Sequence, residues 1–171
     1  VIIGLWNEGY DLTRHNLGAM FVDELAKSFN LSFSKNSKLF SYIVRKDKYL
    51  FVKPSVYMNQ SGLSVSKVVN FFKIELNQFT IVHDDMDLHL GKYKMKLGGG
   101  SAGHNGIKSI DQNLGNQNYW RIRIGVGRPE FQGQVVDYVL GKIEDNEITI
   151  IKKGFGDLIN LQNQSKIPAF L

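Results

Sequence analysis

The sequence of 171 residues contains no cysteine. Disulfides, thiolate metal sites and cysteine nucleophiles are therefore excluded, and the absence fits a reducing cytoplasm. No apolar run approaches the roughly 18 residues that a membrane-spanning helix needs, and no signal peptide is visible. We therefore expect a cytoplasmic protein that has no membrane as a partner.

Common functional motifs are missing as well. No Gly-x-Ser-x-Gly elbow is present, so a serine-nucleophile hydrolase has no support in the sequence. The glycine-rich segment 98–106 is not followed by Gly-Lys-Ser or Gly-Lys-Thr, and it does not match the dinucleotide fingerprint. Neither a P-loop nor a Rossmann-type cofactor site is therefore indicated.

The composition is that of an ordinary globular protein. Hydrophobic residues make up 43% and charged residues 22% of the chain. The length suits one domain, 1–171, which can bury a sufficient hydrophobic core without disulfides or metal ions to stabilise it. We expect a monomer. The formal charge of +5 and the pI near 9.3 favour a polyanionic partner. Many basic domains bind no polyanion, so the charge alone leaves this question open.

Apolar periodicity predicts strands that alternate with helices. Strands are expected at 1–6, 39–45, 49–53, 79–83, 92–97 and 119–126, and helices near 17–29, 63–72, after 106 and from 145 onward. Ser61 is a plausible N-cap of the second helix. The alternation predicts a single-domain α/β fold with helices on both faces of a twisted sheet. The hairpin with its turn near Asp47 makes that sheet mixed.

Candidate catalytic residues gather where the first strand ends and the first helix begins. Asn7 follows the strand, and His15 and Asn16 lead into the helix. Ligands bind at such strand ends in α/β sheets, and a histidine is a candidate general base because its ordinary pKa lies near working pH. The alternative is that Asn16 only caps the helix and that His15 is a polar loop residue.

The strand 79–83 runs into a segment of three aspartates and two histidines between His83 and His89. A carboxylate at a strand end can orient a histidine, stabilise its charged form or help to hold a metal ion. A solvated acidic turn would explain the same residues. The sequence alone leaves these three interpretations open.

The segment 98–106 lies between two strands that each carry basic residues. Its backbone N–H groups could approach a ligand closely, and the helix N-terminus that follows favours anions. Alternation places Lys92, Lys94 and Lys96 on one face of the first strand, and Arg121 and Arg123 on one face of the second. These faces could bind phosphates. The alternatives are a flexible connection and edge-strand lysines that prevent aggregation.

Several motifs follow one another along nearly the whole chain: Gly4-Leu5-x-Asn7-x-Gly9-Tyr10, Thr13-Arg14-His15-Asn16-x-Gly18, Tyr57-Met58-Asn59-x-Ser61-Gly62, His83-Asp84-Asp85-x-Asp87-Leu88, Lys96-x-Gly98-Gly99, Gly103-His104-Asn105-Gly106 and Arg121-Ile122-Arg123-Ile124-Gly125. Together they resemble the bacterial peptidyl-tRNA hydrolase family. The combination is highly specific.

The resemblance implies an enzyme that hydrolyses the ester between a peptide, or an N-blocked aminoacyl group, and the 3′ end of tRNA. It implies that His15 activates the attacking water, that Asp84 holds and polarises His15, and that no metal or other cofactor takes part. The residues implied to bind the peptide backbone and to place water or stabilise the oxyanion are Asn7, Asn59 and Asn105. Contacts with the peptide or the tRNA are implied for Tyr10, Tyr57, Met58, Lys94, Lys96, His104 and Arg123.

One loop departs from the family pattern, which has Asn-Pro-Gly and two further residues before the tyrosine. Here Glu8 takes the place of the proline and Tyr10 directly follows Gly9. The shorter loop could shift Asn7 relative to His15. Two other functions therefore stand as alternatives: a relative that binds structured RNA without hydrolysing it, and a metal-dependent phosphoesterase built on residues 84–89.

Overall fold

The computed structural model of the protein describes residues 1–129 and 132–163. Its strands form one sheet in the order β2-β3-β4-β1-β5-β7-β6. The central strands run parallel; they are β4 (Tyr49–Pro54), β1 (Ile2–Gly4), β5 (Thr80–Asp85) and β7 (Trp120–Gly125). Antiparallel strands complete both sides; they are β2 (Ser34–Asn36), β3 (Ser41–Lys46) and β6 (Tyr93–Leu97).

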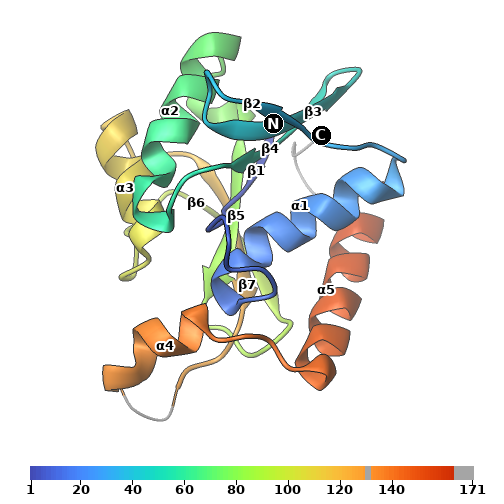
Figure 1. The fold of residues 1–171 in the computed structure, drawn as a ribbon, viewed down its shortest axis with the longest axis vertical. Helices are drawn as coiled ribbons and strands as arrows, with labels where there is room; N and C mark the ends of the chain where they lie inside the picture. The colour runs from blue at the N-terminus through green and yellow to red at the C-terminus, as the bar shows by residue number, and fades with distance from the viewer. Residues whose placement is uncertain (130–131, 164–171) are drawn as a thin grey trace.

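Helices cover both faces of the sheet (Figure 1). Helices α1 (Leu17–Ser28) and α5 (Asp145–Asn163) pack on one face, and α2 (Ser61–Phe72) and α3 (Asn105–Leu114) pack on the other. Successive residues of a strand point to opposite faces of the sheet. Ile2 packs in the core beneath α1 and α5, and Ile3 packs in the core beneath α2 and α3. The predicted α/β fold with a mixed sheet and helices on both faces is confirmed. Within the described ranges no helix combines the length and apolar character that crossing a bilayer requires.

Two elements and one helix cap differ from the sequence-based expectation. The short strand β2 and the helix α4 (Val135–Leu140) were not expected. The assignment of Ser61 as an N-cap is wrong, because Gln60 holds that position and Ser61 is the first helical residue. The 3₁₀ turn η2 (Met58–Gln60) runs directly into α2, so the Ser61 hydroxyl donates backwards to the Met58 carbonyl at 2.7 Å.

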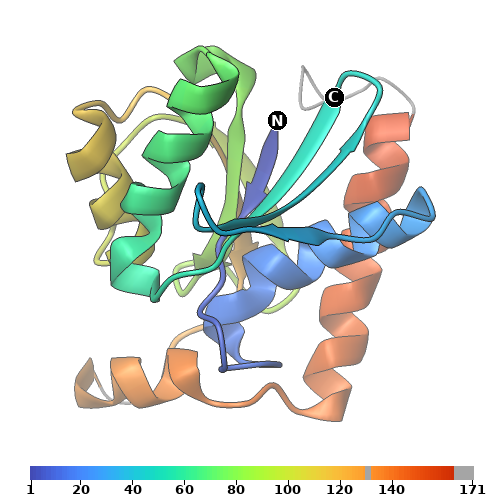
Figure 2. The same cartoon turned by 45° about the horizontal axis from the view of Figure 1, so that its top comes forward.

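The carboxyl ends of the parallel strands meet at one edge of the sheet, where ligands bind in open α/β folds. The segments that leave this edge include the 3₁₀ turn η1 (Arg14–Asn16), which precedes α1, and η2, which precedes α2. Helix α4 lies across this edge, apart from the helices that cover the two faces (Figures 1 and 2). The strand ends, η1, η2 and α4 therefore surround a common space.

A very close approach between α1 and the sheet fixes where η1 lies. A Cβ atom built on Gly18 would lie 2.1 Å from the Val82 carbonyl oxygen and 2.6 Å from the Leu5 nitrogen. No side chain larger than hydrogen fits there, because real Cβ atoms do not approach backbone atoms so closely. This packing holds η1 against the carboxyl end of β5.

We expect Gly18→Ala to lower the free energy of unfolding by about 1–3 kcal/mol, the usual cost of overpacking a tight interface. Gly156→Ala is the control, since a Cβ there would meet nothing within 4 Å. In the middle of α5 that substitution should be neutral or stabilising by up to about 1 kcal/mol. Chemical unfolding of both variants measures the difference, and equal stabilities would contradict the close-approach argument.

Candidate active site

Asp84 is the buried centre of the site. It lies in β5 with 3% of its surface exposed, and its Oδ1 accepts hydrogen bonds from His15 Nδ1 and His104 Nε2, each at 2.9 Å. Burial by itself would raise the pKa of Asp84, but the two histidines hold that pKa below its usual value. An ionised carboxylate only accepts hydrogen bonds, so both of these ring nitrogens carry their protons.

His15 extends from η1 and is 7% exposed. Because its Nδ1–H is donated to Asp84, its Nε2 keeps a lone pair, which is the form in which an imidazole acts as a base. The structure thus brings together His15 and Asp84, as expected if the carboxylate at the strand end orients a histidine. It does so because η1, which precedes α1, ends beside the carboxyl end of β5.

His104 is held on both of its ring nitrogens. Its Nε2–H is donated to Asp84, and its Nδ1 accepts from the backbone N–H groups of Gly106 at 3.1 Å and Ile107 at 3.3 Å. The residue is therefore the N-cap of α3. Its ring centroid lies 4.6 Å from that of His15. The sequence indicated only a substrate contact for His104 and did not reveal this capping role.

The acidic segment after β5 is paired rather than merely solvated. Arg123 Nε donates to Asp85 at 2.5 Å, and Arg128 pairs with Asp87. The metal site considered on the sequence would have used residues 84–89 alone. The structure instead groups His15 and His104 around Asp84, with ligand atoms within 4.8 Å of one another, and these three residues could hold a metal ion.

Asn7 is held in the site by a neighbouring amide, Asn16, which is 2% exposed. Asn16 Oδ1 accepts from the Asn7 N–H at 2.7 Å, and its Nδ2 donates to the carbonyls of Asn7 at 3.1 Å and Tyr10 at 2.8 Å. The Asn7 side chain accepts from the Met58 N–H through Oδ1 at 3.2 Å. The Asn7 NH₂ group is therefore the donor end of an oriented amide. Asn16 occupies the N-cap position of α1, as considered on the sequence, but its side chain makes no capping bond and holds the Asn7 backbone instead.

The shortened loop is anchored by other contacts. Glu8 Oε1 accepts from the Tyr42 hydroxyl at 3.2 Å and from Lys35 Nζ at 3.5 Å. Asn7 lines the same cleft as His15 despite the missing proline. The Tyr10 side chain is 41% exposed and is not among the residues that line this cleft. The loop therefore places Asn7 in the site and leaves the Tyr10 ring outside it.

A cleft of about 440 Å³ opens beside these residues. Its polar wall contains His104 and the candidate catalytic side chains, namely Asn7, His15, Asn59, Asp84 and Asn105. Its apolar wall is formed by Met58 and by four residues of α4, namely Val135, Val136, Val139 and Leu140. Tyr57 lines the cleft with 64% of its surface exposed. The apolar wall from α4 was not predicted from the sequence, because that helix was not.

A second pocket of about 390 Å³ adjoins the cleft and is basic. Its cationic lining residues are Lys96, Arg121 and Arg123, and the residues that it shares with the cleft include Asp85 and Asp87. In the β6–β7 ladder Lys96 lies opposite Arg121, and Lys94 lies opposite Arg123, so the two predicted basic faces form one surface. Lys94 does not line the pocket.

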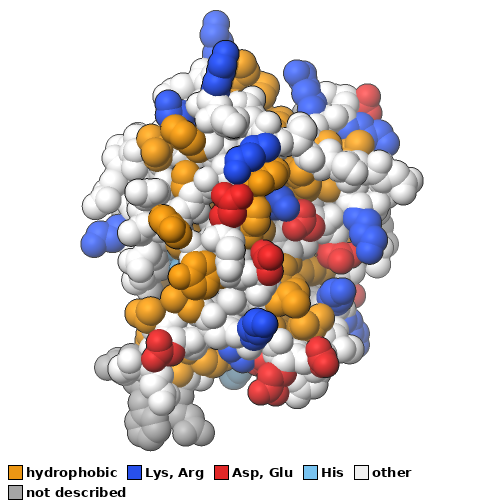
Figure 3. Space-filling model, in the orientation of Figure 1, with side chains coloured by type: hydrophobic (Ala, Val, Ile, Leu, Met, Phe, Trp, Pro, Cys, Tyr) orange, Lys and Arg blue, Asp and Glu red, His pale blue; other side chains and the backbone are white. Residues whose placement is uncertain are grey.

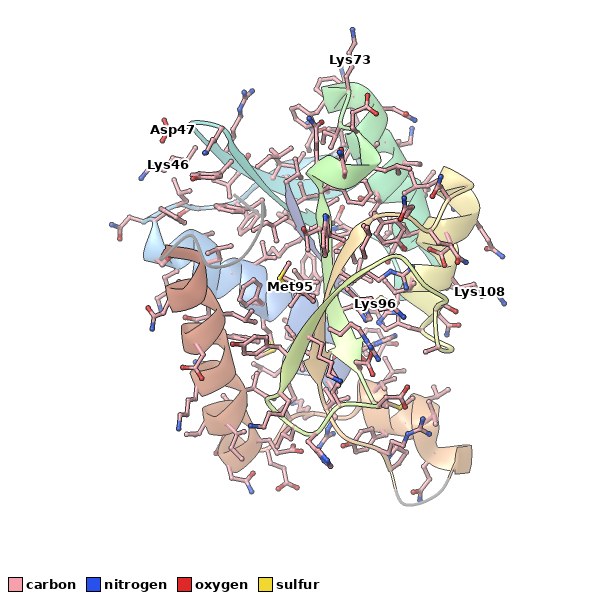
Figure 4. All side chains as sticks on the ribbon, turned by 180° about the vertical axis from the view of Figure 1, so that it is seen from behind. Lys46, Asp47, Lys73, Met95, Lys96 and Lys108 are labelled. Carbon is pink, nitrogen blue, oxygen red and sulfur yellow. The ribbon has the colours of Figure 1, made fainter. Side chains whose placement is uncertain are left out.

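The basic surface is on the side of the molecule seen in Figure 4, where Lys96 and Met95 are labelled on β6. Met95 packs against the α1–α5 core, so Lys96 points to the other face. The opposite side of the molecule shows basic and acidic side chains intermixed (Figure 3).

Arg121 supports the glycine-rich segment. Its side chain is 3% exposed; it donates to the Gly100 carbonyl at 2.9 Å and to Asp111 Oδ1 at 3.2 Å. Tyr119 donates to the same carboxylate oxygen at 2.7 Å. Arg121 thus ties the segment that precedes His104 to α3. The sequence marked it only as part of a basic face.

These features define the class of protein: an α/β protein that holds a histidine–carboxylate pair and amide side chains in a cleft at the carboxyl ends of its strands, with a second pocket that carries cationic side chains beside it. A histidine oriented in this way has the chemistry of a general base, and amide side chains have that of hydrogen-bond donors. Comparison with known proteins identifies the family. The family model described as peptidyl-tRNA hydrolase matches residues 1–164.

Individual relatives agree with that match. The peptidyl-tRNA hydrolase of Wolbachia pipientis wMel is 45% identical in an alignment that covers 100% of this chain and 97% of the relative. That of Mycoplasma capricolum subsp. capricolum is 44% identical over 92% of this chain and 87% of the relative. The crystal structure of peptidyl-tRNA hydrolase from Acinetobacter baumannii has a TM-score of 0.89 and 33% identity, covering 98% of this chain and 89% of that one. The chain belongs to the peptidyl-tRNA hydrolase family, which confirms the resemblance of its motifs.

The site contains one further histidine whose charge state can be tested. His83 Nδ1 lies 2.7 Å from the Asp84 carbonyl, and its Nε2 is buried with no hydrogen-bond partner among the described residues. Burial, and next the nearby His104, lower the pKa of His83 to about 3. His83 is therefore neutral and carries its proton on Nδ1.

We expect nuclear magnetic resonance to show a neutral His83 ring, protonated on Nδ1, down to about pH 5, well below the ordinary histidine pKa. The folded pKa of about 3 lies below the ordinary histidine pKa of 6.5, so the unfolded chain binds more protons between these values. His83 therefore reduces the free energy of unfolding as the pH falls from about 6.5 towards 3. A His83 ring that titrates between about pH 6 and 7 would contradict this assignment.

Proposed function

We propose that this chain hydrolyses the ester between the peptide and the 3′ ribose of peptidyl-tRNA, with His15 as general base and without a metal ion. The observation that carries the proposal is the hydrogen bond from His15 to the buried Asp84 carboxylate at 2.9 Å inside a cleft lined by amide side chains. We further propose that the working unit is a monomer of one domain in the cytoplasm.

The reaction begins with a water molecule beside His15 Nε2. The imidazole takes a proton from the water, and the water oxygen forms a bond to the ester carbon, whose carbonyl oxygen becomes an oxyanion. The bond from that carbon to the ribose oxygen then breaks, and the imidazolium returns its proton to the leaving oxygen. Asp84 stabilises the imidazolium and keeps its ring in the productive orientation.

The amides have a separate task. Asn7 is oriented by the Met58 N–H, so its NH₂ group can donate to the peptide or to the developing oxyanion. Asn59 and Asn105 are exposed residues that line the same cleft and have the same donor chemistry. Donors fixed before the reaction stabilise developing charge at little reorganisation cost.

The tRNA phosphates would bind along β6 and β7. Lys96 and Arg123 line the basic pocket next to the cleft, and the exposed Lys94 extends the same face towards solvent. Phosphate contacts fix the position of a nucleic acid without reading its sequence. This arrangement suits an enzyme that accepts many tRNAs.

We expect His15→Ala to lower kcat by about 10²- to 10⁴-fold, the usual contribution of a general base. Asp84→Asn should also lower kcat while tRNA binding persists, because the charge that stabilises the imidazolium is lost. Release of the peptide from a purified N-blocked aminoacyl-tRNA measures both effects. A chelator should leave the rate unchanged.

The control variants are His89→Ala and Asp23→Asn, which change exposed residues outside the cleft. Near-normal turnover by His15→Ala would refute its role as the base. Loss of activity with chelator and recovery with a divalent ion would favour the metal interpretation. Tight tRNA binding by the parent protein without any ester cleavage would favour the RNA-binding alternative.

We expect Lys94→Ala and Lys96→Ala to raise KM with little change in kcat, because phosphate contacts act on binding and not on bond breaking. Each substitution should also flatten the salt dependence of tRNA binding by about one unit of log slope. Lys46→Ala, on the β3–β4 hairpin across the molecule from Lys96 in Figure 4, is the matched control. A salt slope equal to that of the parent protein would leave these lysines as ordinary edge-strand residues.

A further inference from the structure

Arg14 and His15 are neighbours on η1, but their side chains reach different parts of the molecule. His15 contacts Asp84, whereas Arg14 reaches the segment that contains α4 and the start of α5. Its Nη2 donates to Glu147 Oε2 at 2.6 Å, and its Nη1 donates to the carbonyls of Tyr138 at 3.4 Å and Lys142 at 3.3 Å. The guanidinium also lies 4.4 Å from the centre of the Tyr138 ring, a cation–π contact.

The backbone around Arg14 follows the same path. The Arg14 N–H donates to the Gly141 carbonyl at 3.3 Å, and the Ile143 N–H donates to the Leu12 carbonyl at 2.9 Å. At the other end of the contact, the Tyr138 hydroxyl donates to the Val126 carbonyl at 2.6 Å. The turn that carries His15 is thus attached to both ends of the short connection between α4 and α5.

Helix α4 has little other support. Val139 is the only buried residue of its six, and Val136 is 63% exposed although it lines the cleft. A helix of this length is marginal without tertiary contacts. The polar contacts made by Arg14 are therefore a large part of what fixes the apolar wall of the cleft.

The Arg14–Glu147 pair is well shielded from solvent, with 12% and 17% of the two side chains exposed. Partial burial works against ionisation of Glu147, but the Glu144 N–H and Arg14 lower its pKa. Arg14 Nε is buried and has no hydrogen-bond partner among the described residues. Changing either partner of such a shielded ion pair removes the whole interaction and leaves the other charge without its partner.

We propose that Arg14 is a positioning residue for peptide binding: with Glu147 and Tyr138 it holds α4 in place as the apolar wall of the cleft and ties that wall to the turn that carries His15. This inference rests on the proposed function. It assigns to Arg14 no contact with the ester, since Arg14 does not line the cleft.

The physical consequence is a change in affinity and not in bond breaking. If the contact is weakened, α4 spends less time in its binding position, and the apparent affinity falls in proportion to the occupied fraction. The His15–Asp84 hydrogen bond does not pass through α4, so kcat is retained. Substrates whose peptide contacts the apolar wall should therefore suffer more than substrates with a small acyl group.

The experiment compares Arg14→Lys and Glu147→Gln with the parent protein on two substrates: N-acetylglycyl-tRNA, and a tRNA carrying an N-blocked peptide with apolar side chains. We expect KM for the apolar peptide to rise about 3- to 10-fold, the range for one or two weakened hydrogen bonds. KM for N-acetylglycyl-tRNA and both kcat values should stay within about twofold. Lys152→Ala, which removes an exposed pair between α5 and Glu24, is the matched control and should behave as the parent protein.

Hydrogen exchange gives a second reading that does not depend on activity. Amides 138–141 should exchange faster in both variants, while those of β5 stay protected. Unchanged exchange in α4 would overturn the proposal, as would an equal loss of kcat on both substrates together with a lowered melting temperature. If the parent protein hydrolyses neither substrate, the proposed function fails, while faster exchange in α4 would still show that Arg14 positions that helix.

Discussion

The buried charge of Asp84 constrains the whole active edge of this molecule. Moving a carboxylate out of water costs several kcal/mol unless hydrogen bonds replace its hydration. Here the replacements come from two histidines, His15 before α1 and His104 at the start of α3. These helices lie on opposite faces of the sheet. The carboxylate that holds His15 therefore also joins the two helical layers at the point where the strands end.

The other requirements of the site follow from this junction. Helix α1 can present His15 to Asp84 only if it lies directly on the backbone of the sheet, and Gly18 permits that approach. Asn16, one residue further along, then fixes the backbone of Asn7. His15 and the amide of Asn7 are thus positioned by a single short turn. This explains how Asn7 can remain beside His15 although the loop between them lacks the family's proline.

Features that depend on local pattern could be predicted from the sequence. The buried stripe of α5, with Ile151, Phe155 and Leu158, recurs at helical spacing and is found in the core. The β3–β4 hairpin, with Asp47 at positive φ in its turn, is equally local. The motifs identified the family because they fix many residue types at once.

Features that depend on distant contacts could not be predicted. Helix α4 is short and has one buried residue, so its periodicity is weak and its position depends on Arg14, more than a hundred residues earlier. Ser61 is of a residue type that often forms N-caps, but its hydroxyl donates a hydrogen bond to the Met58 carbonyl in the preceding 3₁₀ turn. Asn16 does stand at the N-cap position of α1, but its side chain bonds to Asn7 and Tyr10 and not to the helix. Side chains of this kind choose among several nearby partners, and only the three-dimensional path of the backbone decides which one they find.

The arginines and the lysines of the basic surface differ in their contacts. Arg121 is committed to Asp111 and to the glycine-rich segment, and Arg123 is bonded to Asp85 at the boundary between the two pockets. A planar guanidinium makes several directed bonds at once and so suits these fixed positions. Lys94 and Lys96 are exposed on the same face, and a flexible ammonium group can follow phosphates whose positions vary between substrates.

An anion near Arg123 would compete with the Asp85 carboxylate for the Arg123 guanidinium. Asp85 directly follows Asp84, the residue whose carboxylate holds His15, in the sequence. Asp85 lines both pockets, and its ion pair with Arg123 at 2.5 Å lies between them.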